Sequence, residues 1–353
     1  MTKRSANKLM NKLLLFVLIA GTLFSCIDQV TLPIRNEAPR LVVDGLITNE
    51  KPPYSVRLSY SGSFTFDQEN PQDQKITDAT VTLRDDAGHA TALAHDVFNP
   101  GFYRTTDSTF VGQPGRSYTL NIRLADGKTY VSAPEKMPAV PGIDSVYARF
   151  MATESITLPY QYYFYANVTD PAAEPNYYRW TAYSYTVRRS TGVPCCLGCP
   201  GICFDRCWLQ YFSQDINIFS DNGVNGNPLP GRLVMRSPIY TPGPTLVEVQ
   251  QYSLTAAAYQ FWRLFKEQQS RTGTIFDPLP ASVIGNISNV NDAGDQALGY
   301  FGASAVTRKR FRERGDDTYG SALYGYISSL TVPQGDCRAT YGWQSPVLEP
   351  PGW

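Results

Sequence analysis

Histidine is nearly absent from this chain, which carries two, His89 and His95, in 353 residues. Both fall in or near an expected turn, where exposed histidine is the usual outcome, and a serine-histidine-aspartate site would have to use one of them. The sequence contains no HExxH metal motif, no GxSxG nucleophile elbow and no glycine-rich phosphate loop. We therefore expect neither enzymatic activity nor a cofactor nor a bound metal.

An excess of charge is also missing, since 31 Lys and Arg balance 31 Asp and Glu. Without its first 25 residues, which hold four positive charges and no negative ones, the chain keeps 27 basic against 31 acidic residues, a formal charge of −4. A nucleic-acid-binding protein would show a basic excess, so we do not expect nucleic acid as a partner. The charged run 308–317 is expected to be a solvated edge or loop.

The N-terminal segment has the order of features of a bacterial lipoprotein signal. A basic start is followed by the apolar run Leu13–Leu23, which is too short for a comfortable membrane span, and by Ser25 and Cys26. The alternatives are a plain secretion signal or a buried strand. We expect residues 1–25 to be a signal peptide, Cys26 to carry acyl chains such as palmitate that anchor the protein to a membrane, and residues 26–39 to be a tether.

Alternating apolar residues dominate the next part of the chain. Tyr54, Val56, Leu58 and Tyr60 fall on one face of a strand, and similar runs recur before turn signals. Strands of this length and spacing predict an immunoglobulin-like β-sandwich over residues 40–136.

Residues 137–353 are predicted to form a larger, aromatic-rich β domain, so that the protein as a whole is mainly β. One long helix is expected at about residues 255–270, after Ser253 or Thr255 as N-cap. The prolines that follow the helix predict a rigid, extended exit.

The predicted helix places Ala258, Phe261, Trp262 and Phe265 on one face, at i, i+3, i+4 and i+7. We expect this face to pack on the second β domain, and Phe261, Trp262 and Phe265 are candidates for contact with a ligand or partner. Asp277 is a further candidate, with the capping of a turn as its alternative role.

Besides Cys26 the chain has six cysteines. Five lie in a cysteine-rich loop at 195–207, namely Cys195, Cys196, Cys199, Cys203 and Cys207, and the sixth is Cys337. The spacing resembles metal ligation. An exported chain meets an oxidising compartment, however, and the count is even with no histidine nearby. We predict disulfides that tie the loop to itself and, through Cys337, to the C-terminal tail. Six cysteines allow 15 connectivities, and the pairing stays open.

Seven short segments are characteristic in their sequence: 39–45, 176–179, 252–255, 259–262, 273–278, 285–287 and 298–301. Together they resemble a family of Bacteroidota outer-membrane lipoproteins catalogued as domain of unknown function 4249, and the resemblance covers nearly the whole mature chain. It implies no catalytic residues. Because family members tend to be encoded beside TonB-dependent transporters, it does imply an outer-membrane β-barrel transporter as partner.

These observations predict a lipid-anchored protein of the outer membrane, on its periplasmic or cell-surface face. The expected function is non-catalytic capture of a ligand, or its hand-over to the transporter. A surface adhesin or structural protein is the first alternative, and a hydrolase with an unrecognised site is the second.

Overall fold

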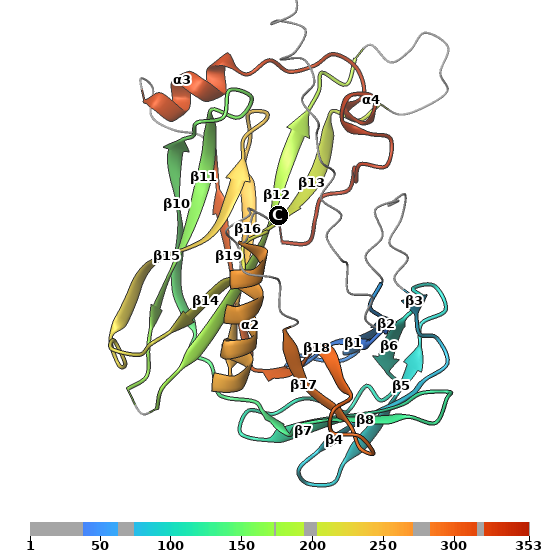
Figure 1. Ribbon diagram of the computed structural model, residues 1–353. Helices are drawn as coiled ribbons and strands as arrows, with labels where there is room; N and C mark the ends of the chain where they lie inside the picture. The colour runs from blue at the N-terminus through green and yellow to red at the C-terminus, as the bar shows by residue number, and fades with distance from the viewer. Residues whose placement is uncertain are drawn as a thin grey trace, which may run out of the picture. The chain divides into compact units, whose positions relative to one another are not determined.

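The computed structural model describes residues 38–62, 74–172, 174–193, 203–270, 283–315 and 321–352. From Pro39 on, the described residues belong to one compact unit. Strands form three sheets, and the described helices are α2 (Ala256–Gln269), α3 (Ala322–Ser329) and α4 (Cys337–Tyr341) (Figure 1). The predicted mainly-β class is confirmed. No helix in these described ranges is long and apolar enough to cross a membrane.

The first sheet has eleven strands. They are β1 Leu41–Thr48, β2 Ser55–Tyr60, β3 Gln74–Lys75, β4 Thr80–Asp85, β5 Ala90–His95, β6 Phe102–Thr105, β7 Ser117–Arg123, β8 Thr129–Ser132, β9 Glu135–Lys136, β17 Ile284–Asn289 and β18 Gln296–Ser304. The pairing runs β1-β18-β17-β8-β7-β4-β5-β6-β2, and β2 pairs again with β1. These strands therefore form one sheet that closes on itself like a barrel, rather than the two packed sheets of the expected sandwich.

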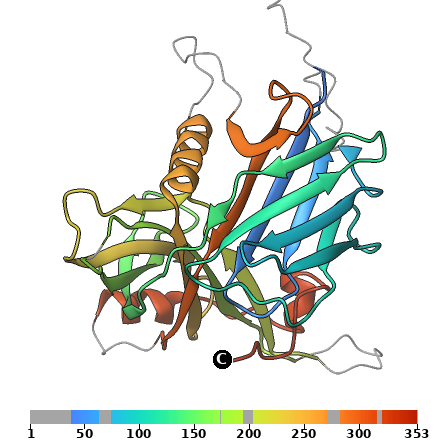
Figure 2. The same cartoon turned by 90° about the horizontal axis from the view of Figure 1, so that it is seen from below.

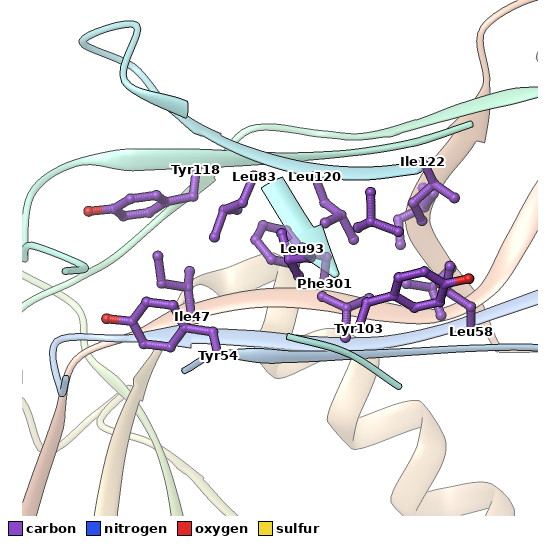
Figure 3. Close-up of a cluster of buried hydrophobic side chains, with 14 of the residues drawn as sticks. Ile47, Tyr54, Leu58, Leu83, Leu93, Tyr103, Tyr118, Leu120, Ile122 and Phe301 are labelled. Carbon is purple, nitrogen blue, oxygen red and sulfur yellow. The ribbon is translucent and has the colours of Figure 1, made fainter. Parts of the chain in front are cut away.

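The first sheet also crosses the domain boundary predicted at 136/137. β18 pairs in parallel with β1, from Val42 opposite Leu298 to Thr48 opposite Ser304. Figure 3 shows Phe301 of β18 in the same core as Leu83 and Leu120, and Phe301 is only 1% exposed. The prediction assigned β17 and β18 to the second domain because alternation shows that a segment is a strand, but not which strand it pairs with.

The other two sheets share a second core. The second sheet has β10 Ile143–Ala152, β11 Tyr160–Thr169 and β15 Pro228–Pro238. The third sheet has β12 Tyr177–Arg189, β13 Arg206–Phe212, β14 Asn217–Ser220, β16 Thr245–Leu254 and β19 Val306–Glu313. Phe164 from the former and Trp180 from the latter are buried in one cluster, so the two sheets pack face to face here. β19 is an edge strand and contains much of the charged run.

The helix α2 connects the third sheet to the first along the chain. Thr255, one of the two expected N-caps, accepts a hydrogen bond at its Oγ1 from the backbone N–H of Ala258 at 3.1 Å. Both views place α2 next to β18 (Figures 1 and 2). Its buried residues Ala258 and Phe261 share a small core with Tyr300 of β18 and Ile218 of β14. The helix thus packs on elements of residues 137–353, as expected, but these elements belong to two different sheets.

The cysteine-rich segment is linked to the C-terminal tail. Cys207 in β13 and Cys337 at the start of α4 form a disulfide with a Cα–Cα distance of 5.7 Å, which confirms that part of the prediction. Cys203 is disulfide-bonded as well. The remaining candidates Cys26, Cys195, Cys196, Cys199 and Asp277 lie outside the described residues.

Candidate functional site

A cavity of about 630 Å³ lies between α2 and the first sheet, and we refer to it as the α2 cavity. The helix contributes Ala258, Phe261, Trp262, Phe265 and Gln268. β1 contributes residues 42–46 and β18 contributes Leu298, Gly299, Tyr300, Gly302 and Ser304. The lining is completed by Arg179, Tyr252, Leu254 and Val283. All three aromatic side chains predicted on the helix face therefore line one cavity.

The aromatic wall of the α2 cavity is organised by Phe261, which is 8% exposed. Its ring lies 4.9 Å from that of Tyr300, 6.1 Å from that of Phe265 in a stacked arrangement, and 5.5 Å from that of Trp262 edge to face. Trp262 is half-buried and Phe265 is 36% exposed. Phe261 is thus the anchor of the helix, while Trp262 and Phe265 have surface left for contact with a ligand.

Arg179 of β12 is the cation of the α2 cavity. Its guanidinium carbon lies 3.7 Å from the centre of the Trp262 ring, a cation–π contact. Burial lowers the pKa of Arg179, while Tyr252 and the Asp44 carboxylate act in the opposite direction. Within the described part of the chain, the guanidinium has no hydrogen-bond or ion-pair partner. Because arginine stays protonated and carries five N–H donors, these donors are available to a bound molecule.

A buried carboxylate lies behind the aromatic wall. Glu135 is 4% exposed and accepts hydrogen bonds from the Tyr300 hydroxyl, at 3.0 Å, and from the Thr255 hydroxyl. Burial raises the pKa of Glu135, and hydrogen bonds from Thr255, Tyr300 and Asn286 oppose that rise. Glu135 thus holds both the N-cap of α2 and a lining tyrosine in place.

A second, more open cavity of about 1090 Å³ lies along β14, β15 and the C-terminal end of α2. Its arginines already have partners. Arg232 donates to Asn217 Oδ1 and to the carbonyl of Ile218, and Arg236 pairs with Asp215 at 3.0 Å. The α2 cavity, whose arginine has no hydrogen-bond or ion-pair partner among the described residues, is the stronger candidate.

The two histidines take part in local contacts of the first sheet. His89 Nδ1 lies 3.0 Å from Asp85 Oδ2, with the His89 side chain 72% exposed, and His95 Nε2 accepts from the backbone N–H of Gly101. No group of three or more His, Cys, Asp or Glu side chains in the described ranges could hold a metal ion.

Sequence reasoning missed Arg179 and Glu135. Arg179 stands in the aromatic run of β12, and a charged residue among buried rings is a signal that could have been followed. Glu135 sits in a two-residue strand beside a proline, with no pattern that distinguishes it from an exposed carboxylate. Only the packing of α2 over β18 makes it a buried group.

The comparisons with known proteins concern the whole chain rather than the cavity. The model of a family described as a domain of unknown function (DUF4249) matches residues 27–310, a span that includes every residue lining the α2 cavity. No curated protein matches the chain. Because the family match covers well over half of the sequence, the chain belongs to the DUF4249 family of domains of unknown function.

Proposed function

We propose that this protein is a non-catalytic outer-membrane lipoprotein that holds a small ligand in the α2 cavity and hands it to a TonB-dependent β-barrel transporter. The observation that carries the proposal is the Arg179 guanidinium, without a protein partner in the described chain, at the wall of an aromatic cavity of about 630 Å³. Protein sites for small molecules are concave, mostly apolar, about 300–1,000 Å³ in volume, and equipped with a few polar groups that orient the ligand.

The lining of the α2 cavity favours binding over turnover. Its charged side chains are Arg179 and Asp44, and the rest of the lining is mainly aromatic, aliphatic or glycine. Chemical catalysis by side chains usually needs a nucleophile or a general acid within hydrogen-bond reach of a second group that activates it. The Tyr300 hydroxyl and the Tyr252 hydroxyl are each engaged with a neighbouring protein group.

Two features outside the α2 cavity support membrane attachment and a transporter as partner. The apolar run that ends at Ser25 and Cys26 is typical of a lipoprotein signal, and the resemblance described above implies a transporter encoded nearby. Ligand capture and hand-over unite these two features with the α2 cavity.

Affinity purification from solubilised outer membranes tests this function. The tagged full-length chain is expected in the outer-membrane fraction together with a β-barrel transporter. A Cys26→Ala control, which removes the acylated sulfur, should leave that fraction. Recovery of the full-length chain from outer membranes without any transporter would refute hand-over. Loss of surface attachment with normal nutrient uptake in a deletion strain would favour the adhesin alternative.

A further inference from the structure

The α2 cavity has two walls of different origin. Along β1, buried residues alternate with Val42, Asp44 and Leu46, which line the cavity, so the outer face of the first sheet forms one wall. α2, β12 and β16 form the other, with Phe261, Trp262 and Arg179.

Gly302 of β18 leaves space in the cavity at the first wall because it has no side chain. Gly302 stands opposite Leu46 in the strand pairing, and a Cβ on Gly302 would meet the Leu46 side chain at 3.3 Å. The space over this pair is therefore kept clear by the absence of a side chain at position 302.

The two charges of the cavity belong to opposite walls. Asp44 lies on β1 and Arg179 on β12, and the Asp44 carboxylate acts on Arg179 electrostatically without forming an ion pair with it. Trp262 covers one face of the guanidinium. Because the N–H groups of a guanidinium point outward in its plane, stacking on a ring leaves them free to donate.

We propose that the α2 cavity binds a small apolar carboxylate, whose carboxylate group is held by Arg179 and whose apolar body lies against Phe261, Trp262 and Phe265. This inference rests on the proposed function, since it names the ligand class of the same site. A planar guanidinium matches a carboxylate through two parallel hydrogen bonds, and an apolar body fits the rest of the lining.

Two classes of molecule carry a carboxylate on an apolar body, and they differ in whether a second, positive charge is present. A fatty acid has a carboxylate alone, whereas an apolar peptide also has an ammonium group, which would be attracted to Asp44. Probes that differ in only one charge separate them: octanoate against octanol, and phenylalanyl-leucine against its C-terminal amide.

Calorimetric titration of the purified, disulfide-intact mature protein with these four probes tests the proposal. A carboxylate probe is expected to bind at least about tenfold more tightly than its neutral or amidated counterpart, as is typical of one charged hydrogen-bonded contact. Arg179→Gln should abolish this preference and Arg179→Lys should keep part of it. Arg236→Gln is the matched control: Arg236 also stacks on an aromatic ring, that of Tyr163, but lies outside the α2 cavity, so binding should not change.

A second variant tests the cavity independently of its charge. Gly302→Leu should fill the space above Leu46 and weaken octanoate and octanol alike, and a thermal unfolding profile like that of the wild type shows that the variant is folded. The proposal is overturned if octanol binds as tightly as octanoate, if Arg179→Gln binds octanoate like the wild type, or if no carboxylate probe binds.

Asp44→Asn decides between the two sources. Weaker binding of phenylalanyl-leucine with unchanged binding of octanoate assigns the site to peptide ends, whereas equal behaviour of both probes assigns it to fatty acids. Because the titrations use the isolated protein, carboxylate binding without a co-purifying transporter refutes hand-over alone. A co-purifying transporter without carboxylate binding refutes the ligand class alone.

Discussion

Glu248 is a buried carboxylate that joins β16 to the edge strand β19. Its side chain is 4% exposed and accepts hydrogen bonds from Arg308 Nη1 and Arg310 Nε, each at 2.6 Å. Arg308 also pairs with Glu50, which follows β1 of the first sheet. The Glu248 carboxylate is therefore part of a charged link between the first and third sheets.

The pKa of Glu248 gives the size of this contribution. Burial by itself would raise the pKa, but hydrogen bonds from Arg310, Arg308, Tyr183 and Gln250 outweigh burial and hold the pKa at about 2, against an ordinary value of 4.5. A gap of roughly 2.5 pH units corresponds to about 3 kcal/mol in the free energy of unfolding. Because the folded-state pKa is depressed, this stabilisation is complete above pH 4.5 and is lost as the pH falls through 2.

Glu248→Gln should therefore destabilise the protein by about 3 kcal/mol at pH 7. The difference between wild type and variant should shrink as the pH falls from 4.5 to 2, because a protonated Glu248 resembles glutamine. Urea unfolding at a series of pH values measures it, and urea adds no salt that would screen the ion pairs.

The matched control is Glu267→Gln on α2. Glu267 pairs with Arg263 at 2.9 Å, but its side chain is 50% exposed. An exposed pair of this kind contributes about 0.5 kcal/mol or less. A Glu248→Gln effect that is equally small at pH 7, or a larger effect that does not change between pH 7 and pH 2, would show that the network does not stabilise the fold as argued.

Three further predictions concern the fold and the helix face. Replacing Cys207 and Cys337 by serine should lower the free energy of unfolding by about 5 kcal/mol, the chain-entropy value for a separation of 130 residues; denaturation of the wild type and of this double variant, both without reductant, gives the comparison. Gly299→Ala should cost about 1–3 kcal/mol or more, because the glycine has φ +84° and a Cβ would lie 2.0 Å from a β1 carbonyl oxygen. Gly302→Ala is its control and should be much milder in the same denaturation assay. Trp262→Ala should cost roughly 2 kcal/mol in thermal unfolding, less than the 3–5 kcal/mol of a fully buried tryptophan, because this ring is half-buried; a cost near zero would contradict its packing on Phe261.

Local features of this protein could be predicted well. The alternating run at 118–124 buries Tyr118, Leu120 and Ile122 in β7, because a strand facing one core needs side chains of period two. Thr255 begins α2 for a similarly local reason, since a hydroxyl three residues before an N–H can accept its hydrogen bond. The grouping of Phe261, Trp262 and Phe265 follows from the helical period alone.

Pairing over long distances was not predictable in the same way. The parallel alignment of β1 with β18 joins residues more than 250 positions apart, and nothing in either strand specifies the other. The expectation of a sandwich over 40–136 therefore located strands correctly, but it did not include β17 and β18, which pair with β8 and β1 and close the sheet. The two-sheet packing occurs later in the chain, around Phe164 and Trp180.

The α2 cavity shows the same division. Periodicity along the chain determines which side chains share the apolar face of α2, because that depends only on neighbours three and four residues away. Whether the face is buried against one sheet or spans two depends on where β18 lies. The same tertiary arrangement brings Arg179 over Trp262 and encloses Glu135 behind Tyr300. The aromatic character of the helix face is thus a property of the sequence. The charge of Arg179 and the opposite wall of β1 and β18 join it only when segments distant in the chain pack together.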